Sequence, residues 1–293
     1  MTNSSPKILI IGSSGQVGSA LVKVLRDKYS LITPPNVFFE CNSYTQLDEK
    51  LQTFRPTTII NTLAYTNVDK AETDKEKVLN LNTIFPKMLA NWCSLNKSLL
   101  IHFSSDYVHS GEISDAYNES DQSHPVNFYG LTKLRGDSYI LKSTADSIIL
   151  RCSWIYSYTH HSFFKTIIKK LQNDTTLKIV EDQFGTPTSA RWIAQITKRL
   201  IEDDKLKKGT QIINCVPNGY TSWYGFGVEI FEQLQKAGFP LKTKNISPIF
   251  SENIQQIAKR PKNSRLDNRK LKSILNNDLI DWKFLLKEEI TEI

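Results

Sequence analysis

Tyr129 and Lys133 are the two residues whose types and spacing could perform acid–base chemistry together. The apolar spacing of the residues that follow predicts a helix, and residues four positions apart project from one face of a helix. An isolated tyrosine has a pKa of about 10, and a lysine ammonium beside it favours the phenolate and so lowers that pKa. A tyrosine of this kind can exchange a proton with a substrate oxygen near neutral pH. Because Tyr-x-x-x-Lys also occurs often by chance, this interpretation needs support from the rest of the chain.

A glycine-rich turn near the start of the chain gives that support. The apolar run Lys7-Ile-Leu-Ile-Ile11 predicts a buried strand, and it leads into Gly12-Ser-Ser-Gly15-Gln-Val-Gly18. The apolar positions of residues 19–25 predict a helix directly after the turn. A strand, a glycine turn and a helix form the context of a dinucleotide-binding fingerprint, because glycines let the pyrophosphate approach and the helix N-terminus offers it N–H groups. A glycine turn without a ligand is the alternative.

The end of the expected second strand leaves the type of dinucleotide open. Residues 29–34 should form this strand, and an acidic residue commonly binds the adenosine ribose at its end. The sequence there is Thr33-Pro-Pro-Asn36, which has neither an acid nor an arginine. The cofactor is therefore expected to be NADPH or NADH, without a preference between them.

Apolar runs and helical patterns alternate through the first half of the chain. We expect strands at residues 7–11, 29–34, 37–40, 57–64, 98–103, 147–154 and 211–216, and helices at 19–25, 44–54, 79–95 and from Tyr129 onward. Such alternation predicts a parallel sheet covered on both faces, that is, an α/β fold with a Rossmann-type doubly wound parallel sheet. Ser104 and Ser105 follow one expected strand, at the sheet edge where ligands bind in such folds.

The pattern becomes looser after Tyr156. Helices at 162–171, 193–201 and 223–234 and a short strand at 177–180 are expected around the last strand of the sheet. We interpret residues 1–156 and 187–216 as an NAD(P)-binding Rossmann domain. Residues 157–186 and 217–293 are interpreted as a smaller C-terminal lobe that binds the substrate.

The composition is that of a folded protein without a membrane segment. The chain of 293 residues suits one large domain or a closely packed pair, and its 40% hydrophobic and 23% charged residues can form a core. It has no run of about 18 apolar residues and no signal-peptide pattern, so we expect a cytoplasmic protein. The four cysteines lack a Cys-x-x-Cys spacing, so we expect buried free thiols and no metal site.

The net charge of +7 is concentrated in one segment. The window from Lys242 to Lys272 contains nine basic and two acidic residues, which accounts for the whole excess. A local cluster fits a diphosphate-bearing ligand at least as well as a nucleic-acid duplex, and no nucleic-acid recognition motif is present. A solvated basic face remains the alternative.

Seven segments, in this order along the chain, resemble the extended short-chain dehydrogenase/reductases. They are Gly12-x-x-Gly15-Gln-Val-Gly18, Ala64-Tyr-Thr-x-Val-Asp-Lys-Ala-Glu72, Ser104-Ser-Asp-Tyr-Val108, Tyr129-Gly-x-x-Lys133, Arg151-x-Ser-Trp154, Gln183-x-Gly-x-Pro-Thr188 and Arg260-Pro-x-Asn-Ser264. The matches span residues 12 to 264. An ordered set of seven motifs is far more specific than Tyr129 and Lys133 alone.

The resemblance implies a role for each matching residue. It makes Tyr129 the proton donor, Lys133 the group that lowers the Tyr129 pKa and holds the nicotinamide ribose, and Ser105 the group that orients and polarises a carbonyl, with Ser104 as a substitute. The implied cofactor-binding residues are Gly12, Gly15, Gln16, Val17, Gly18, Glu40, Ala64, Tyr65, Thr66 and Lys133. The implied substrate-binding residues are Val68, Asp69, Ser105, Asp106, Tyr129, Trp154 and Arg260. A core Trp154, a surface Asp69 and an Arg260 that binds no phosphate are the alternatives.

The resemblance also implies a reaction. It is the NAD(P)H-dependent reduction of the 4-keto group of a nucleotide-linked 6-deoxy sugar, with dTDP-4-dehydro-L-rhamnose giving dTDP-L-rhamnose for polysaccharide synthesis. The alternatives are a related enzyme with another sugar, or a non-catalytic member that binds a partner, like the regulatory subunit of methionine adenosyltransferase. Leu63 and the pair His109-Ser110 depart from the family pattern, which leaves the identity of the sugar open. A homodimer is also left open.

Overall fold

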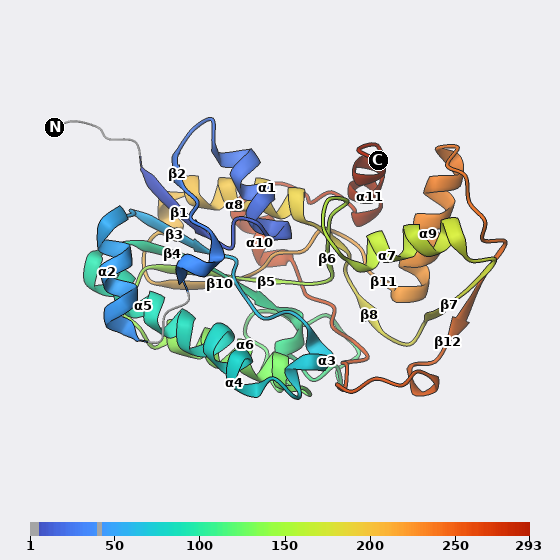
Figure 1. Cartoon of the computed structure of the whole chain (residues 1–293), viewed down its shortest axis with the longest axis horizontal. Helices are drawn as coiled ribbons and strands as arrows, with labels where there is room; N and C mark the ends of the chain where they lie inside the picture. Colours follow the sequence, from blue (N-terminus) through green and yellow to red (C-terminus); the bar gives the residue numbers. More distant parts are fainter. Residues whose placement is uncertain (1–5, 40–42) are drawn as a thin grey trace.

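The computed structural model describes residues 6–39 and 43–293, and a six-stranded parallel sheet lies at its centre (Figure 1). In spatial order its strands are β10 (Thr210–Asn214), β5 (Ser147–Cys152), β4 (Leu99–Ser105), β3 (Thr58–Asn61), β1 (Lys7–Ile11) and β2 (Ser30–Ile32). Every neighbouring pair is parallel. The expected α/β fold is therefore confirmed.

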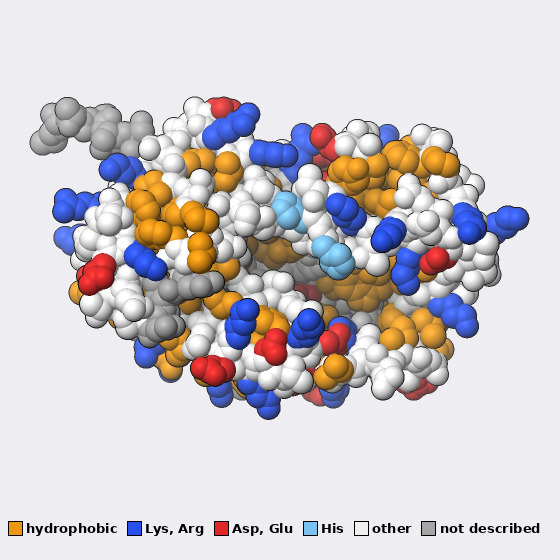
Figure 2. All heavy atoms as spheres, viewed as in Figure 1, with side chains coloured by type: hydrophobic (Ala, Val, Ile, Leu, Met, Phe, Trp, Pro, Cys, Tyr) orange, Lys and Arg blue, Asp and Glu red, His pale blue; other side chains and the backbone are white. Residues whose placement is uncertain are grey.

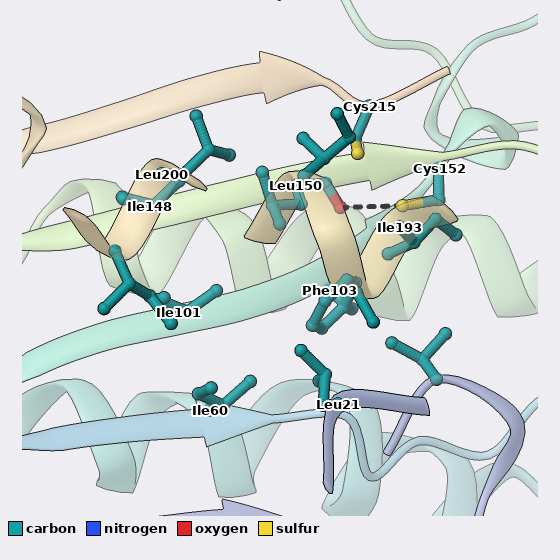
Figure 3. Packing of buried hydrophobic residues seen from close by; sticks show 14 of the residues in the cluster. Leu21, Ile60, Ile101, Phe103, Ile148, Leu150, Cys152, Ile193, Leu200 and Cys215 are labelled. Carbon is teal, nitrogen blue, oxygen red and sulfur yellow. Dashed lines mark hydrogen bonds between the residues drawn. The ribbon is translucent and has the colours of Figure 1, made fainter. Parts of the chain in front are cut away.

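Helices cover both faces of this sheet, which explains why its strands are apolar throughout. Helices α1 (Gln16–Leu25) and α8 (Ala190–Glu202) pack on one face, and α2 (Tyr44–Phe54) and α5 (Phe85–Asn96) pack on the other. In β1, Ile8 belongs to the first cluster and Leu9 to the second, because successive side chains point to opposite faces. Figure 3 shows Ile60, Ile101 and Ile148 of three neighbouring strands within the first cluster.

The strand expected at residues 37–40 is wrong for the described residues. Asn36–Phe39 form a short 3-10 helix, and the Phe38 N–H donates to the Pro35 carbonyl oxygen at 2.9 Å. The two preceding prolines have no N–H to offer to a sheet. The ring of Phe38 packs against Phe54 instead, with centroids 5.4 Å apart. Glu40 lies outside the described residues, as does Cys41.

The helix expected at residues 79–95 contains an irregular turn. It consists of α4 (Lys75–Leu79), a π-helical turn (Asn80–Ile84) and α5. The turn places Asn82 in the interior, where its amide accepts from the Tyr65 N–H at 2.8 Å and donates to the Tyr65 carbonyl oxygen at 3.1 Å. Such turns are frequent at functional sites, and this one fixes the loop after β3.

The second half of the chain adds a smaller group of elements with its own core (Figure 1). These are α7 (Phe163–Asn173), β7 (Thr176–Val180), α9 (Trp223–Lys236), β12 (Asn245–Ile249) and α11 (Trp282–Ile290). Strands β7 and β12 form a separate parallel pair. Tyr156, Phe164, Phe226 and Trp282 fill the cluster between these elements.

We predict that Gly18→Ala destabilises the protein, because α1 crosses the glycine turn too closely for a side chain. A Cβ on Gly18 would overlap the Gly12 carbonyl oxygen, so α1 would have to shift away from β1. The expected loss is about 1–3 kcal/mol of unfolding free energy. Gly15→Ala is the matched control, because its Cβ would meet the Gly12 carbonyl oxygen at an ordinary 3.4 Å. Equal denaturation midpoints for the two variants would contradict this account.

Candidate active site

A pocket of about 770 Å³ lies at the carboxyl edge of the sheet, between the glycine turn and helix α6 (Phe128–Leu141). The face drawn in Figure 2 is hollowed between the two groups of elements, with histidine side chains at the rim. Of the residues singled out from the sequence, the pocket brings together Gly12, Gly15, Gln16, Val17, Ala64, Thr66, Ser105, Asp106, Tyr129, Lys133 and Trp154.

Other expected site residues do not line this pocket. They are Gly18, Tyr65, Val68, Asp69 and Arg260, while Glu40 lies outside the described residues. Gly18 packs on the turn itself, as described above. The Tyr65 hydroxyl donates to Asp74 Oδ2 at 2.5 Å, so its side chain is directed toward the start of α4.

Asn127 holds the first turn of α6, which carries Tyr129. It is the N-cap of the helix, and its side-chain amide also donates to the Lys259 carbonyl oxygen at 2.8 Å. The Phe128 N–H donates to Glu72 Oε1 at 2.8 Å. The turn is therefore attached both to the C-terminal segment and to the region after β3.

Tyr129 has a raised pKa, which is opposite to the direction expected from its spacing to Lys133. Burial raises the pKa of the Tyr129 hydroxyl to about 12, and a hydrogen bond with Ser105 offsets part of the rise. The Tyr107 ring stands edge-on to Tyr129, with centroids 6.0 Å apart. Burial outweighs the groups that would favour the phenolate, so Tyr129 is a phenol at neutral pH and can donate a proton.

Lys133 is an ammonium buried at the floor of the pocket, with 2% of its surface exposed. Its Nζ donates to the Phe103 carbonyl oxygen at 2.5 Å and lies 3.3 Å from His102 Nε2. Burial lowers the Lys133 pKa to about 8, and the charge of Asp137 counteracts the shift. Lys133 therefore remains largely charged at neutral pH, although it is inside the protein.

A buried polar network surrounds Lys133, and no local pattern in the sequence predicted it. Asn61 Nδ2 lies 3.1 Å from His102 Nδ1, and the Ser104 hydroxyl donates to Asp137 Oδ2 at 2.6 Å. Arg151 Nε is 3.8 Å from the same carboxylate. Burial holds the His102 pKa well below its usual value, so this histidine is neutral. One signal was available, because His102 interrupts the apolar run of β4.

Ser105 and Asp106 follow Ser104 at the end of β4, and their hydroxyl and carboxyl groups are linked. The Ser105 hydroxyl donates to Asp106 Oδ1 at 3.0 Å, and Ser153 donates to Asp106 Oδ2 at 2.9 Å. Burial raises the Asp106 pKa to about 6, against the opposing effect of these hydrogen bonds. The Ser104 hydroxyl is bonded to Asp137, whereas the Ser105 hydroxyl is the one that forms a hydrogen bond with Tyr129.

Trp154 joins the pocket to the smaller group of elements. Its indole stacks on Trp223 of α9, with centroids 3.5 Å apart and planes 5° from parallel. Its backbone has a φ of 44°, a left-handed conformation that bulky residues rarely adopt. A Cβ on Gly185 would overlap the indole, so only glycine leaves room for it. Trp154 is thus both a packing residue and part of the pocket wall.

Asp69 and Arg260 form an ion pair between segments that lie 191 residues apart. Arg260 Nη2 donates to Asp69 Oδ2 at 2.7 Å and Nη1 donates to Oδ1 at 3.2 Å. The Ala258 N–H also donates to Asp69 Oδ1 at 3.0 Å. Arg260 lowers the Asp69 pKa, so the carboxylate stays ionised. The pair fastens the segment before Arg260 onto α3 (Val68–Ala71).

Other basic side chains of the Lys242–Lys272 window have separate acidic partners. Lys262 lies 3.7 Å from Asp182, Arg269 pairs with Asp267, and Lys272 lies 3.1 Å from Asp278. Together with Arg260, four of the nine basic residues of this window therefore take part in ion pairs.

His109, one of the departures from the family pattern, is buried away from the pocket. Its ring stacks on Tyr117, with centroids 4.1 Å apart, and burial lowers its pKa to about 4. It packs the loop that follows β4 and does not line the pocket. Leu63, the other departure, does line it.

Several lining residues were not expected from the sequence: Ser14, Asn36, Thr62, Asn67, Phe103, Cys152, Ile155, His160 and His161. Most follow the ends of sheet strands, a position that could have identified them. His160 and His161 come from the loop between β6 (Ile155–Tyr156) and α7, which no sequence pattern connects with the glycine turn. A neighbouring cavity of about 1150 Å³ shares Asn36 and Leu63 with the pocket.

Within residues 6–39 and 43–293, no three or more His, Cys, Asp or Glu side chains are grouped so as to hold a metal ion. In the same part of the chain, no helix combines the length and apolarity needed to span a membrane. Cys93, Cys152 and Cys215 are buried and free.

Comparison with known proteins agrees with this arrangement. The family model described as RmlD substrate binding domain matches residues 6–293. The dTDP-4-dehydrorhamnose reductase of Escherichia coli (strain K12) is 31% identical, over 98% of this chain and 97% of that protein. The crystal structure of a dTDP-4-dehydrorhamnose reductase from Clostridium acetobutylicum has a TM-score of 0.89 at 32% identity, covering 98% of this chain and 99% of that one.

A further solved structure contains a dinucleotide. The dTDP-4-dehydrorhamnose reductase from Bacillus anthracis in complex with NADP has a TM-score of 0.90 at 27% identity, covering 99% of this chain and 100% of that one. Because the family model spans all but the first five residues, the chain belongs to the RmlD substrate binding domain family.

Proposed function

We propose that the protein is an NADPH- or NADH-dependent oxidoreductase that converts dTDP-4-dehydro-L-rhamnose to dTDP-L-rhamnose. The observation that carries this proposal is the meeting of Ser105, Tyr129 and Lys133 with the glycine turn in one pocket. Similarity over nearly the whole chain to proteins named dTDP-4-dehydrorhamnose reductase supports the choice of substrate.

The glycine turn has the form that a pyrophosphate requires. Gly15 is the N-cap of α1, and no side chain caps this helix. A helix N-terminus left open in this way offers its N–H groups to an anion. We assign Gly12, Gly15, Gln16 and Val17 to the pyrophosphate. Ala64, Thr66 and Lys133 are assigned to the nicotinamide half, and Gly18 supports the turn by packing.

Each catalytic side chain has a separate task in the proposed reduction. The bound dinucleotide supplies hydride to C4 of the sugar. Tyr129 donates its proton to the oxygen on C4, and its raised pKa keeps that proton in place until the step occurs. Ser105 orients the carbonyl by hydrogen bonding, and the Lys133 ammonium favours the phenolate that remains on Tyr129.

The sugar nucleotide is assigned to the space between the pocket and the smaller lobe. Trp154 and Asp106 line the pocket there, and Trp154 is held by the lobe through Trp223. We propose a division into a dinucleotide-binding domain (1–156 and 187–216) and a substrate-binding lobe (157–186 and 217–293). The second apolar cluster, formed mainly by α7, α9 and α11, supports the lobe, although Leu271, Leu279 and Leu285 of the lobe pack in the cluster of the sheet. We propose that Val68, Asp69 and Arg260 act on the substrate from the edge of this space.

The proposal is tested by mixing the protein with NADPH, and separately with NADH, and dTDP-4-dehydro-L-rhamnose. We expect loss of the reduced nicotinamide absorbance together with formation of dTDP-L-rhamnose, identified by mass and NMR. Faster turnover of a different 4-keto sugar nucleotide would show that the proposed reaction type is right and the proposed substrate is wrong. Dinucleotide binding without reduction of any 4-keto sugar nucleotide would reject the proposed enzymatic activity.

Tyr129→Phe should remove turnover and leave dinucleotide affinity nearly unchanged. The substitution deletes the proton donor and retains the ring that packs against Tyr107. The expected loss in kcat is on the order of 10² or more. Stopped-flow kinetics and a binding titration measure the two effects separately. Near-normal kcat in this variant would mean that another group donates the proton.

Arg260→Lys should raise the KM for the sugar nucleotide by roughly tenfold, with kcat and dinucleotide affinity changed much less. A lysine cannot reproduce the two parallel hydrogen bonds to Asp69. Lys262→Gln is the matched control, because Lys262 is two residues away, largely exposed and paired only loosely with Asp182. If both variants had the same KM as the wild type, Arg260 would have no part in substrate binding.

A further inference from the structure

The described lining of the pocket contains little positive charge near the glycine turn. It includes one lysine and no arginine, and that lysine, Lys133, donates to the Phe103 carbonyl oxygen at the end of β4. The remaining lining residues that can become cationic are His160 and His161. A dinucleotide brings two negative charges to this turn, so the source of the compensating charge matters.

His160 already reaches across the pocket to the turn. Its Nε2 lies 2.9 Å from the Ser14 carbonyl oxygen, although the two residues are 146 positions apart. Because a carbonyl oxygen only accepts hydrogen bonds, Nε2 carries the proton. Its Nδ1 lies 2.9 Å from the Thr159 hydroxyl, which accepts or donates according to the charge of the ring. The imidazole is therefore held over the turn with an N–H directed at it.

We propose that His160, together with His161, binds the pyrophosphate of the dinucleotide and closes the pocket over it. The turn and the first residues of α1 supply N–H groups from one side, and the two imidazoles supply charge from the other. Hydrogen bonds between an imidazolium and a phosphate oxygen are charge-assisted and stronger than neutral ones. This inference rests on the dinucleotide site proposed above.

Most charged groups near the two histidines are engaged elsewhere. A cavity of about 460 Å³, which Ser157 and Thr159 help to line, is also lined by Lys23 of α1, Arg191 of α8, Glu289 of α11 and Glu292 just after it. Arg191 pairs with Glu292 at 3.0 Å, and Glu289 accepts hydrogen bonds from the Ser189 hydroxyl and the Tyr158 N–H. On the adjoining helix α7, Lys165 lies over the Tyr158 ring. The segment 12–18 contains no titratable side chain.

The proposal predicts that dinucleotide affinity falls as the pH rises. A protonated imidazole attracts the pyrophosphate by charge and a neutral one does not, so the gain in affinity is present at mildly acidic pH and is lost at mildly alkaline pH. NADH is the suitable probe, because the 2′-phosphate of NADPH itself titrates near about pH 6. Burial raises the pKa of Asp106, in the same pocket, to about 6. Because Asp106 is present in every variant, its contribution to the pH dependence is the same in all of them.

The experiment measures NADH affinity by fluorescence titration at a mildly acidic and a mildly alkaline pH. The variants are His160→Gln, His161→Gln and the double variant, since glutamine can still donate to Ser14 but carries no charge. The matched control is His124→Gln, whose exposed histidine lies outside the pocket lining. We expect the double variant to bind NADH roughly tenfold more weakly at the acidic pH and to lose most of the pH dependence. When both dinucleotides are compared at the same pH, the double variant should bind NADPH more weakly by the same factor as NADH.

Four outcomes would decide against the proposal. Unchanged NADH affinity in the double variant, or a pH dependence equal to that of the wild type, would show that the histidines do not hold the pyrophosphate. Weakened binding of NADPH alone would place the contact on the 2′-phosphate. Gly15→Val separates these results from failure of the site itself: if it abolishes NADH binding, the dinucleotide site stands whatever the histidine variants show. A wild type that binds neither dinucleotide would reject the site and the proposal together.

Discussion

The burial of the Lys133 ammonium at the end of β4 is the interaction on which the rest of the site depends. A charge inside the protein is tolerated only when it is paired and hydrogen-bonded. The Phe103 carbonyl oxygen accepts from it, and the charge of Asp137, one helical turn further along α6, opposes the fall of its pKa. A buried ammonium without these compensating groups would be strongly destabilising. The position of α6 on the sheet, and with it Tyr129, is thereby fixed.

Burial changes the acidity of the pocket groups in different directions. It raises the Tyr129 pKa to about 12 and the Asp106 pKa to about 6, and it lowers the Lys133 pKa to about 8. Each shift favours the neutral form of the group. The consequence is a phenol that retains its proton beside an amine that still holds a charge at neutral pH. This combination suits donation of a proton and not its removal, which agrees with a reductase.

Long-range contacts at the pocket join the smaller lobe to the edge of the sheet. Trp154 stacks on Trp223, Arg260 pairs with Asp69, and His160 contacts Ser14. Each contact lies at or near the mouth of the pocket and links residues far apart in the sequence. Leu271, Leu279 and Leu285 of the same half of the chain also lie in the apolar cluster of the sheet, so the two parts share a continuous core beside the pocket.

The sequence by itself determined the sheet, the glycine turn and the reacting pair. These are local patterns: an apolar strand, a turn that only glycines permit, and residues four apart on a helix each carry their structural meaning within about ten residues. The seven ordered motifs added the family. The strand expected at residues 37–40 failed because two prolines and a phenylalanine that packs on Phe54 favour a 3-10 turn there.

Only the tertiary structure decided the environment of those residues. The direction of the Tyr129 pKa shift depends on how deeply α6 is buried, and the commitment of Ser104 to Asp137 depends on the packing of β4 against α6. Arg260 was expected to grip a ligand, and the fold places an acidic partner beside it. His160 was not expected at all, because its loop meets the glycine turn from 146 residues away. Such contacts are properties of packing between distant segments, and no local spacing in the chain encodes them.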